Sequence, residues 1–227
     1  MTTQITGVLF DLDGTLADTA IDLVAALNMS LNDNGYTPEP LEKMRHAASH
    51  GSMALVNAAK PNLSDEDKLR LQQGLLAHYV SVNGQHCQLF EGIAQVLTYL
   101  DAHNIPYGIV TNKPARFTRP LLHALGITAN MMSIISGDST RFAKPHTAPM
   151  LLAAQQLKCV PAQILYVGDA MRDLEAANAA NMLGGIALWG YLSEQDTPDL
   201  WPHQVQLRAP TDIVSFISAR NAGKTTI

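Results

Sequence analysis

The chain has 227 residues, of which 47% are apolar, and this is enough to bury a sizeable core. Only 15% of the residues are charged, which excludes a disordered polypeptide. The formal net charge of -5 argues against a nucleic-acid partner, because phosphates attract a basic face.

The same sequence gives no sign of a membrane or secretory protein. No apolar run approaches the roughly 18–20 residues that span a bilayer. The first residues, MTTQITGVLF, lack the basic start of a signal peptide. Cys87 and Cys159 form no CxxC pair, so we expect neither a disulfide framework nor a thiolate zinc site. We therefore expect a soluble cytoplasmic protein, either a monomer or a weak homodimer.

Short apolar runs alternate with amphipathic stretches along most of the chain. The runs predict strands at residues 5–10, 107–110, 132–135, 164–167, 185–188 and 205–207. Helical patterns lie between them at residues 92–103, 115–125, 147–157 and 172–181. Continuous apolar runs are typical of strands that are buried on both faces. The alternation therefore predicts an α/β fold with a doubly wound, Rossmann-like parallel sheet.

One segment interrupts this alternation. Residues 19–85 contain only helical patterns, such as 20–32 and 65–82, punctuated by prolines and glycines. Ser64, with Asp67 three residues later, is a weak helix-start signal. We predict a helical cap at residues 18–86, inserted into a core made of residues 1–17 and 87–227.

Two acidic motifs follow buried strands. DLDGT contains Asp11 and Asp13, and GDAMRD contains Asp169 and Asp173. An isolated DxD is most simply an acidic turn that caps a helix. Here, however, the carboxyl ends of parallel strands meet at one edge of the sheet, so the four carboxylates should gather in one cleft. Carboxylate oxygens without Cys or His ligands suit Mg²⁺.

Two further polar residues follow other elements of the predicted sheet. Thr111 in VTN supplies a hydroxyl, and Lys144 in AKP supplies a cation, and both can hold an anionic group. Carboxylates, Mg²⁺, a lysine and a threonine in one cleft predict a phosphoryl-transfer site.

In this order, the four motifs resemble those of the haloacid dehalogenase-like hydrolases. The resemblance covers nearly the whole chain, including a helical insert in the position of that superfamily's small cap. It implies that Asp11 is the nucleophile and forms an aspartyl-phosphate. It implies that Asp13 protonates the leaving alkoxide and then deprotonates the attacking water. Dehalogenating members lack this second acid, so the resemblance favours a phosphate ester as the substrate.

The same resemblance implies the binding residues. Mg²⁺ would be held by the carboxylates of Asp11 and Asp169 and the backbone carbonyl of Asp13, with Asp173 in support. Thr111 and the backbone of Asn112 would bind the phosphoryl oxygens, and Lys144 would balance their charge. Positive charge nearby would keep Asp11 ionised.

Within the superfamily the chain looks most like the phosphoglycolate phosphatase group. FEGIAQVLTYL at 90–100 and VTNKP at 110–114 carry that likeness. TNKPARF, GDAMRDLE and the late segment at 190–201 further resemble the N-acetylmuramic acid 6-phosphate phosphatases. The substrate is therefore expected to be a small phosphorylated metabolite, 2-phosphoglycolate or N-acetylmuramic acid 6-phosphate. The segment at 190–201 is alternatively a surface loop whose Trp201 packs on the core.

The loop SHGSM at 49–53 lies where this group has its substrate-facing cap loop. Related muramic acid enzymes tend to have an arginine where Met53 stands here, and His50 replaces a glycine. His50 is a candidate contact for a substrate carboxylate, or else a solvated loop histidine. His46 and His50 have the spacing of a zinc pair, but Gly51 follows at once and a solvated helix end is favoured.

Other functions remain open at this point. A phosphomutase would return the phosphoryl group to a second position of a sugar phosphate. A catalytically silent binding module would have no chemical need for Asp11, Asp13, Thr111, Lys144 and Asp169 together. The C-terminal sequence NAGKTT has the tail of a phosphate-binding loop but lacks its first glycine, so we expect a frayed terminus there.

Overall fold

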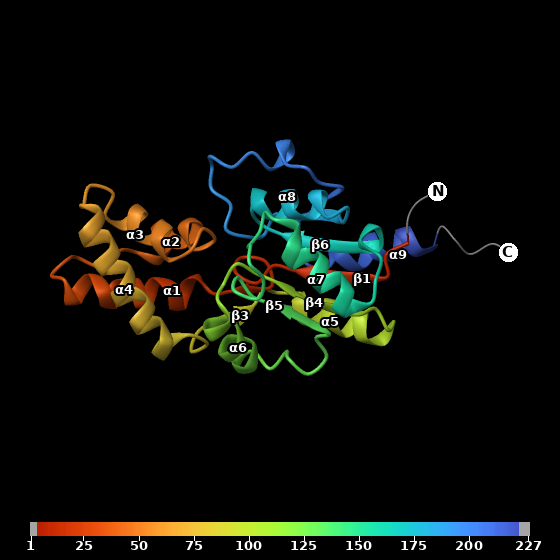
Figure 1. Ribbon diagram of the computed structural model, residues 1–227, viewed down its shortest axis with the longest axis horizontal. Helices are drawn as coiled ribbons and strands as arrows, with labels where there is room; N and C mark the ends of the chain where they lie inside the picture. The colour runs from red at the N-terminus through yellow and green to blue at the C-terminus, as the bar shows by residue number, and fades with distance from the viewer. Residues whose placement is uncertain (1–3, 223–227) are drawn as a thin grey trace.

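A computed structural model describes residues 4–222 of the chain. The end of NAGKTT therefore lies outside the described residues. The molecule has two parts, a parallel sheet with helices on both faces and a block of four helices beyond one edge of it (Figure 1). Within residues 4–222, no helix has the length and apolar character needed to cross a membrane.

The sheet has six parallel strands in the order β5-β4-β1-β6-β7-β8. Their bounds are Gly7–Phe10 (β1), Tyr107–Val110 (β4), Ser133–Ile135 (β5), Ile164–Gly168 (β6), Leu183–Ala187 (β7) and Val205–Leu207 (β8). Each coincides with a predicted strand to within two residues at either end. The doubly wound α/β prediction is confirmed, and β1, the first strand in sequence, lies at the centre of the sheet.

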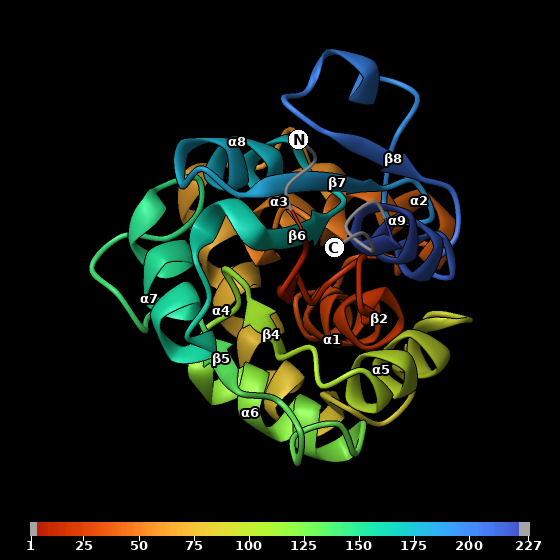
Figure 2. The same cartoon turned by 90° about the vertical axis from the view of Figure 1, so that its right-hand side faces the viewer.

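Alternating side chains of the central strand β1 pack into two different hydrophobic cores, one on each face of the sheet. Val8 and Phe10 pack towards one face, while Leu9 packs towards the other. The first face is covered by Ile93–Ala102 (α5), Ala115–Ala124 (α6) and Asp212–Ala222 (α9), and the second by Thr147–Leu157 (α7) and Met171–Ala179 (α8) (Figure 2). Helix α9 was not predicted, although its Ile213 and Ile217 are buried in the core of the first face. Two short 3₁₀ helices, Pro161–Gln163 and Pro198–Leu200, complete this part.

The helical block contains Ala20–Asp33 (α1), Leu41–Ala48 (α2), Ser52–Ala59 (α3) and Asp65–Val82 (α4). The start of α4 agrees with its sequence signal, because the Ser64 hydroxyl accepts a hydrogen bond from the backbone N–H of Asp67. The block has its own apolar cluster, which Phe117 and Tyr191 join from the sheet part. Such a cluster stabilises α2 and α3 in particular, because helices of eight residues are unstable in isolation.

Two linkers join the helical block to the sheet. Ala17–Asp18 (β2) and Gln88–Leu89 (β3) pair as a two-stranded antiparallel ribbon, so the chain leaves and re-enters the sheet part at one place. Buried Asp22 on α1 accepts hydrogen bonds from the backbone N–H groups of Gly84 (2.9 Å) and His86 (3.1 Å). The boundary of the cap at residues 18–86 stays a prediction, and this ribbon supports it.

Asp22→Ala is expected to lower the free energy of unfolding by about 3 kcal/mol, because the linker amides lose a buried charged acceptor. Urea denaturation measures this, and Glu91→Ala, at an exposed position, is the control and should change stability by less than about 0.5 kcal/mol. An equal effect of both substitutions would contradict the role given to Asp22.

Candidate active site

The predicted site residues meet at the carboxyl edge of the sheet. Asp11 directly follows β1, Thr111 follows β4 and Asp169 follows β6. Strand β1 lies between β4 and β6, so these three ends are neighbours. The chain winds outwards in both directions from β1, and such a switch point is where open α/β sheets bind their ligands.

Lys144 lies at the centre of this edge and is buried. Its Nζ is 2.8 Å from Asp11 Oδ1 and 2.8 Å from Asp173 Oδ1. The Val110 carbonyl and the Tyr166 hydroxyl also accept from it, each at 2.8 Å. A buried ammonium with this many acceptors is fixed in place and holds two carboxylates together.

The loop that carries Lys144 is attached to the loop that follows β4. The Asn112 side chain donates to the Lys144 carbonyl (2.9 Å) and accepts from the Lys144 backbone N–H (2.9 Å). The side chain of Asn112 thus positions Lys144. Thr111, expected to bind phosphate, is buried, and Thr111 and Asn112 both line a cavity above this edge of the sheet, whereas Lys144 does not.

Asp11, Asp169 and Asp173 each offer a carboxylate oxygen within 4.8 Å of the others. Among residues 4–222 this is the only group of three or more His, Cys, Asp or Glu side chains close enough to share a metal ion. An all-oxygen donor set fits Mg²⁺. Asp13 was also predicted to bind the metal, through its backbone carbonyl, and its side chain lies outside this group.

The charges of this cluster are not balanced by Lys144 alone. Burial, and then the Asp11 and Asp173 charges, raise the pKa of Asp169 to about 7. Burial also raises the pKa of Asp11, although Lys144 opposes this. Burial acts on Asp173 too, but Lys144 and Arg172 outweigh it and its pKa is lowered. Three buried carboxylates with one buried lysine therefore favour a further cation.

Asp13 lies beside the cluster and has different partners. Its Oδ1 accepts from Lys113 Nζ (2.7 Å) and from the Thr19 hydroxyl (2.5 Å). Lys113 was missed in the sequence, where only its place beside Thr111 and Asn112 in TNKP distinguishes it. It is buried, and the attraction of Asp13 outweighs the effect of burial and raises its pKa. The ammonium therefore stays charged and fixes the Asp13 carboxylate.

A cavity of about 610 Å³ opens above these residues, between the sheet part and the helical block. Its floor includes Asp11, Asp13 and Thr111, and its walls come from both parts. The walls include Leu23, Ala48, Ser49, His50, Gly51, Ser52, Gln72, Leu76, Tyr79, Asn112, Lys113, Pro114, Arg116, Phe117 and Arg172. Its size is typical of a small-molecule site.

The loop at 49–52 is held over the cavity by Arg172 of α8. The Arg172 guanidinium donates to the Ser49 carbonyl (2.7 Å) and lies 3.1 Å from His50 Nδ1. Burial, followed by the Arg172 charge, lowers the pKa of His50, so this side chain is a neutral group at the rim.

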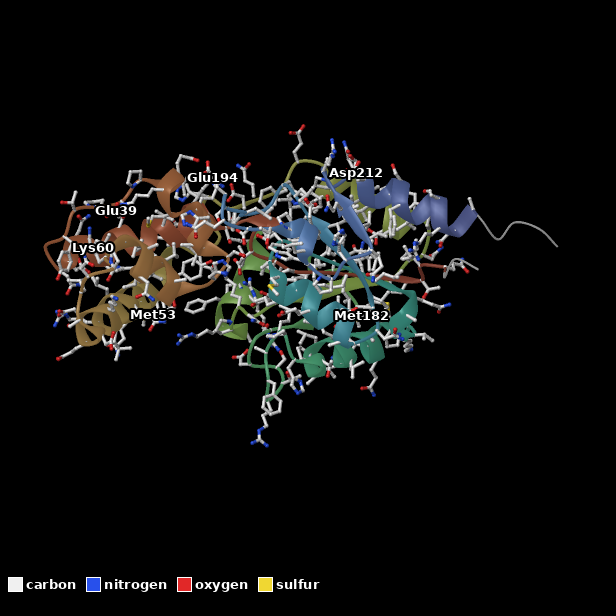
Figure 3. All side chains as sticks on the ribbon, turned by 90° about the horizontal axis from the view of Figure 1, so that it is seen from above. Glu39, Met53, Lys60, Met182, Glu194 and Asp212 are labelled. Carbon is white, nitrogen blue, oxygen red and sulfur yellow. The ribbon has the colours of Figure 1, made fainter. Side chains whose placement is uncertain are left out.

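The two histidines of the discounted zinc pair lie apart. Helix α2 ends at Ala48, so His50 is beyond the helix that carries His46. His46 lines a second cavity of about 440 Å³, with Glu42, Arg45 and residues 190–195. Figure 3 shows one of its lining residues, Glu194, at the junction of the two parts. In the same segment Trp201 is buried against Leu174 and Ile186, as the surface-loop interpretation predicted.

Comparisons with known proteins agree with this geometry. Residues 8–184 match the family model described as "Haloacid dehalogenase-like hydrolase". The chain is 37% identical to a phosphoglycolate phosphatase of Xylella fastidiosa over 89% of each chain. It is 33% identical to an N-acetylmuramic acid 6-phosphate phosphatase of Pseudomonas putida, over 97% of this chain and 99% of the other. A crystal structure of a predicted phosphoglycolate phosphatase from Haemophilus somnus superimposes with a TM-score of 0.83 at 26% identity, covering 94% of this chain and 98% of that one.

The pKa of Asp169 makes the metal-free protein sensitive to pH. In the folded state this carboxyl titrates near pH 7, above its ordinary value of 3.8, so ionisation opposes folding as the pH rises from about 4 to 7. In EDTA, Asp169→Asn should unfold with nearly the wild-type free energy at pH 4 and should be more stable by about 3 kcal/mol at pH 8. Asp101→Asn, an exposed control, should match wild type at both pH values. A difference that does not change with pH would contradict this assignment.

Proposed function

The chain belongs to the haloacid dehalogenase-like hydrolase family, and we propose that it is a Mg²⁺-dependent phosphatase that hydrolyses a small phosphate monoester through an aspartyl-phosphate on Asp11. The observation that carries this proposal is the environment of Asp11. Its carboxylate is buried on the floor of a cavity, 2.8 Å from the Lys144 ammonium and directly beside Asp169 and Asp173.

The side chains present fit a magnesium ion. Asp11 and Asp169, with Asp173 and the backbone carbonyl of Asp13 in support, would hold it. When bound, the ion withdraws charge from the phosphoryl oxygens and favours the ionised form of Asp11. The raised pKa values of Asp11 and Asp169 support this assignment, because Lys144 does not offset the burial of Asp11 and does not pair with Asp169.

In the first step, an Asp11 carboxylate oxygen attacks phosphorus and the bond from phosphorus to the ester oxygen breaks. The Asp13 carboxyl group enters this step protonated and gives its proton to the leaving alkoxide, which leaves Asp13 as a carboxylate. In the second step, Asp13 takes a proton from water as that water attacks phosphorus. The bond between phosphorus and Asp11 then breaks, inorganic phosphate leaves, and both carboxyl groups return to their starting states.

The remaining side chains of the site bind the phosphoryl group and orient Asp13. Thr111, Asn112 and Lys144 bind and neutralise the phosphoryl group, and Lys113 and Thr19 keep the Asp13 side chain beside it. The loop at 49–52, fixed by Arg172, lines the cavity from the side of the helical block, and we expect it to limit the access of water during the first step.

The cavity also favours a substrate with a second anionic group. Lys113, Arg116 and Arg172 line it, and its volume of about 610 Å³ accommodates more than a two-carbon ester. We propose a carboxylate-bearing phosphate ester as the substrate, with 2-phosphoglycolate and N-acetylmuramic acid 6-phosphate as the candidates. The volume favours the larger of the two.

Asp11→Asn should lower kcat by about 10⁴-fold or more while the protein stays folded, because the amide is not a nucleophile. Steady-state phosphate release and circular dichroism together measure this. Asp101→Asn is the control and should keep the wild-type rate. Turnover of Asp11→Asn well above background would contradict the nucleophile assignment.

Removal of the metal tests the proposed dependence on Mg²⁺. Phosphate release should be abolished by EDTA and restored by Mg²⁺.

A comparison of substrates tests the proposed specificity. One of the two carboxylate-bearing esters should exceed plain hexose phosphates by at least about tenfold in kcat/KM. Isomerised sugar phosphate without phosphate release would instead indicate a mutase. Mg²⁺ binding with no hydrolysis of any ester, even an activated aryl phosphate, would indicate a silent binding module.

A further inference from the structure

Tyr191 is a buried side chain that the proposed chemistry does not use. It lies in the segment after Leu183–Ala187 (β7) and is only 4% exposed. Burial and the neighbouring Asp18 raise its pKa well above the ordinary value, so the hydroxyl keeps its proton. Its backbone faces the candidate metal site, and its hydroxyl faces the first linker to the helical block.

On the metal side, the backbone N–H of Tyr191 donates to Asp169 Oδ2 at 3.0 Å. The approach of the two loops leaves no room for side chains. A Cβ at Gly14 would collide with the Asp169 carboxylate and the Tyr191 ring, and a Cβ at Gly190 would collide with Asp169 and the Gly14 carbonyl. The Thr15 hydroxyl also donates to Asp169 Oδ1 at 3.1 Å, and the Ser49 hydroxyl lies 3.4 Å from Asp169 Oδ2. The Tyr191 backbone is therefore one of the groups that orient the Asp169 carboxylate, and the donor with the shortest distance to it.

On the linker side, the Tyr191 hydroxyl accepts from the backbone N–H groups of Thr19 (2.7 Å) and Ala20 (2.9 Å). These amides open helix α1, and the Thr19 side chain does not cap the helix because it donates to Asp13. The tyrosine supplies from a distant segment the acceptor that a helix N-terminus requires.

The same hydroxyl continues into the helical block. It donates to Asp18 Oδ1 at 2.7 Å, and the other oxygen of Asp18 accepts from Arg45 on α2 at 2.6 Å. The Tyr191 ring also packs edge-to-face on Phe90, next to β3, with the ring centres 6.2 Å apart. Tyr191 thus contacts both linkers, and the Asp18 carboxylate connects its hydroxyl to Arg45 of α2.

We propose that Tyr191 is a positioning residue that links Asp169 to the hinge of the helical block, so that the placement of α2 over the cavity and the geometry of the metal carboxylate are coupled. This inference rests on the proposed function only in taking Asp169 as a metal ligand. If Tyr191 only packed its ring in the apolar cluster, loss of the hydroxyl would have no effect. Tyr191→Phe, which removes only the hydroxyl, therefore separates packing from coupling.

The first experiment is hydrogen exchange on the metal-free protein. In Tyr191→Phe the amides of Thr19 and Ala20 lose their acceptor and should exchange about tenfold faster. Tyr99→Phe is the matched control, since it removes a hydroxyl that contacts Ser218 away from the linkers. Unchanged exchange at Thr19 and Ala20 in Tyr191→Phe would overturn the proposal.

The second experiment titrates Mg²⁺ calorimetrically into each protein without substrate. Kd should rise about fivefold in Tyr191→Phe and about twofold in Arg45→Met, whose ion pair is partly exposed, while Tyr99→Phe should match wild type. The double variant should show less than the product of the two effects, because both act through Asp18.

The outcomes separate the two proposals. Faster exchange with an unchanged Mg²⁺ affinity in Tyr191→Phe would overturn the coupling and leave Tyr191 as a helix cap. An affinity that falls in Tyr191→Phe but is unaffected by Arg45→Met would overturn the connection to α2. A wild-type protein that binds no Mg²⁺ would contradict the proposed function, whatever the exchange rates show.

Discussion

The site depends on one constraint, the burial of three carboxylates around one ammonium. Asp11, Asp169 and Asp173 are brought together by adjacent strand ends, and Lys144 bonds to two of them. Burying like charges this closely is costly unless cations compensate them. The position of Lys144 is therefore fixed by Asn112, Tyr166 and Val110, and the remaining negative charge favours a metal.

The sequence predicted the sheet well because a parallel strand has a strong signal. Its residues are buried on both faces, so β4 and β6 are visible as unbroken apolar runs. The ribbon of β2 and β3 could not be predicted, because each strand has only two residues and so shows no periodicity. The paired residues are also about 70 positions apart in the sequence. Helices α2 and α3 were seen only as a helical region, since each has just eight residues.

Some site residues could likewise be predicted from the sequence, and others could not. Asp11, Thr111 and Asp169 were predictable because they end strands, and Lys144 because it stands in a known motif order. Lys113, Arg172 and the Tyr191 hydroxyl owe their roles to contacts with segments at least 100 residues away, and nothing in their neighbourhoods indicates those partners. His50 was named as a candidate, and the structure places it at the rim of the cavity, where contact with a substrate stays a prediction.

Capture of the covalent intermediate would decide whether Asp11 is the nucleophile. The enzyme would be mixed with substrate and Mg²⁺, quenched in acid within milliseconds and reduced with borohydride, which converts an aspartyl-phosphate to homoserine. Homoserine is expected at position 11 alone, at a yield that falls once substrate is exhausted. Homoserine at another aspartate would contradict Asp11 as the nucleophile. The absence of homoserine during steady turnover would also contradict it, provided that no step before hydrolysis of the intermediate is rate-limiting.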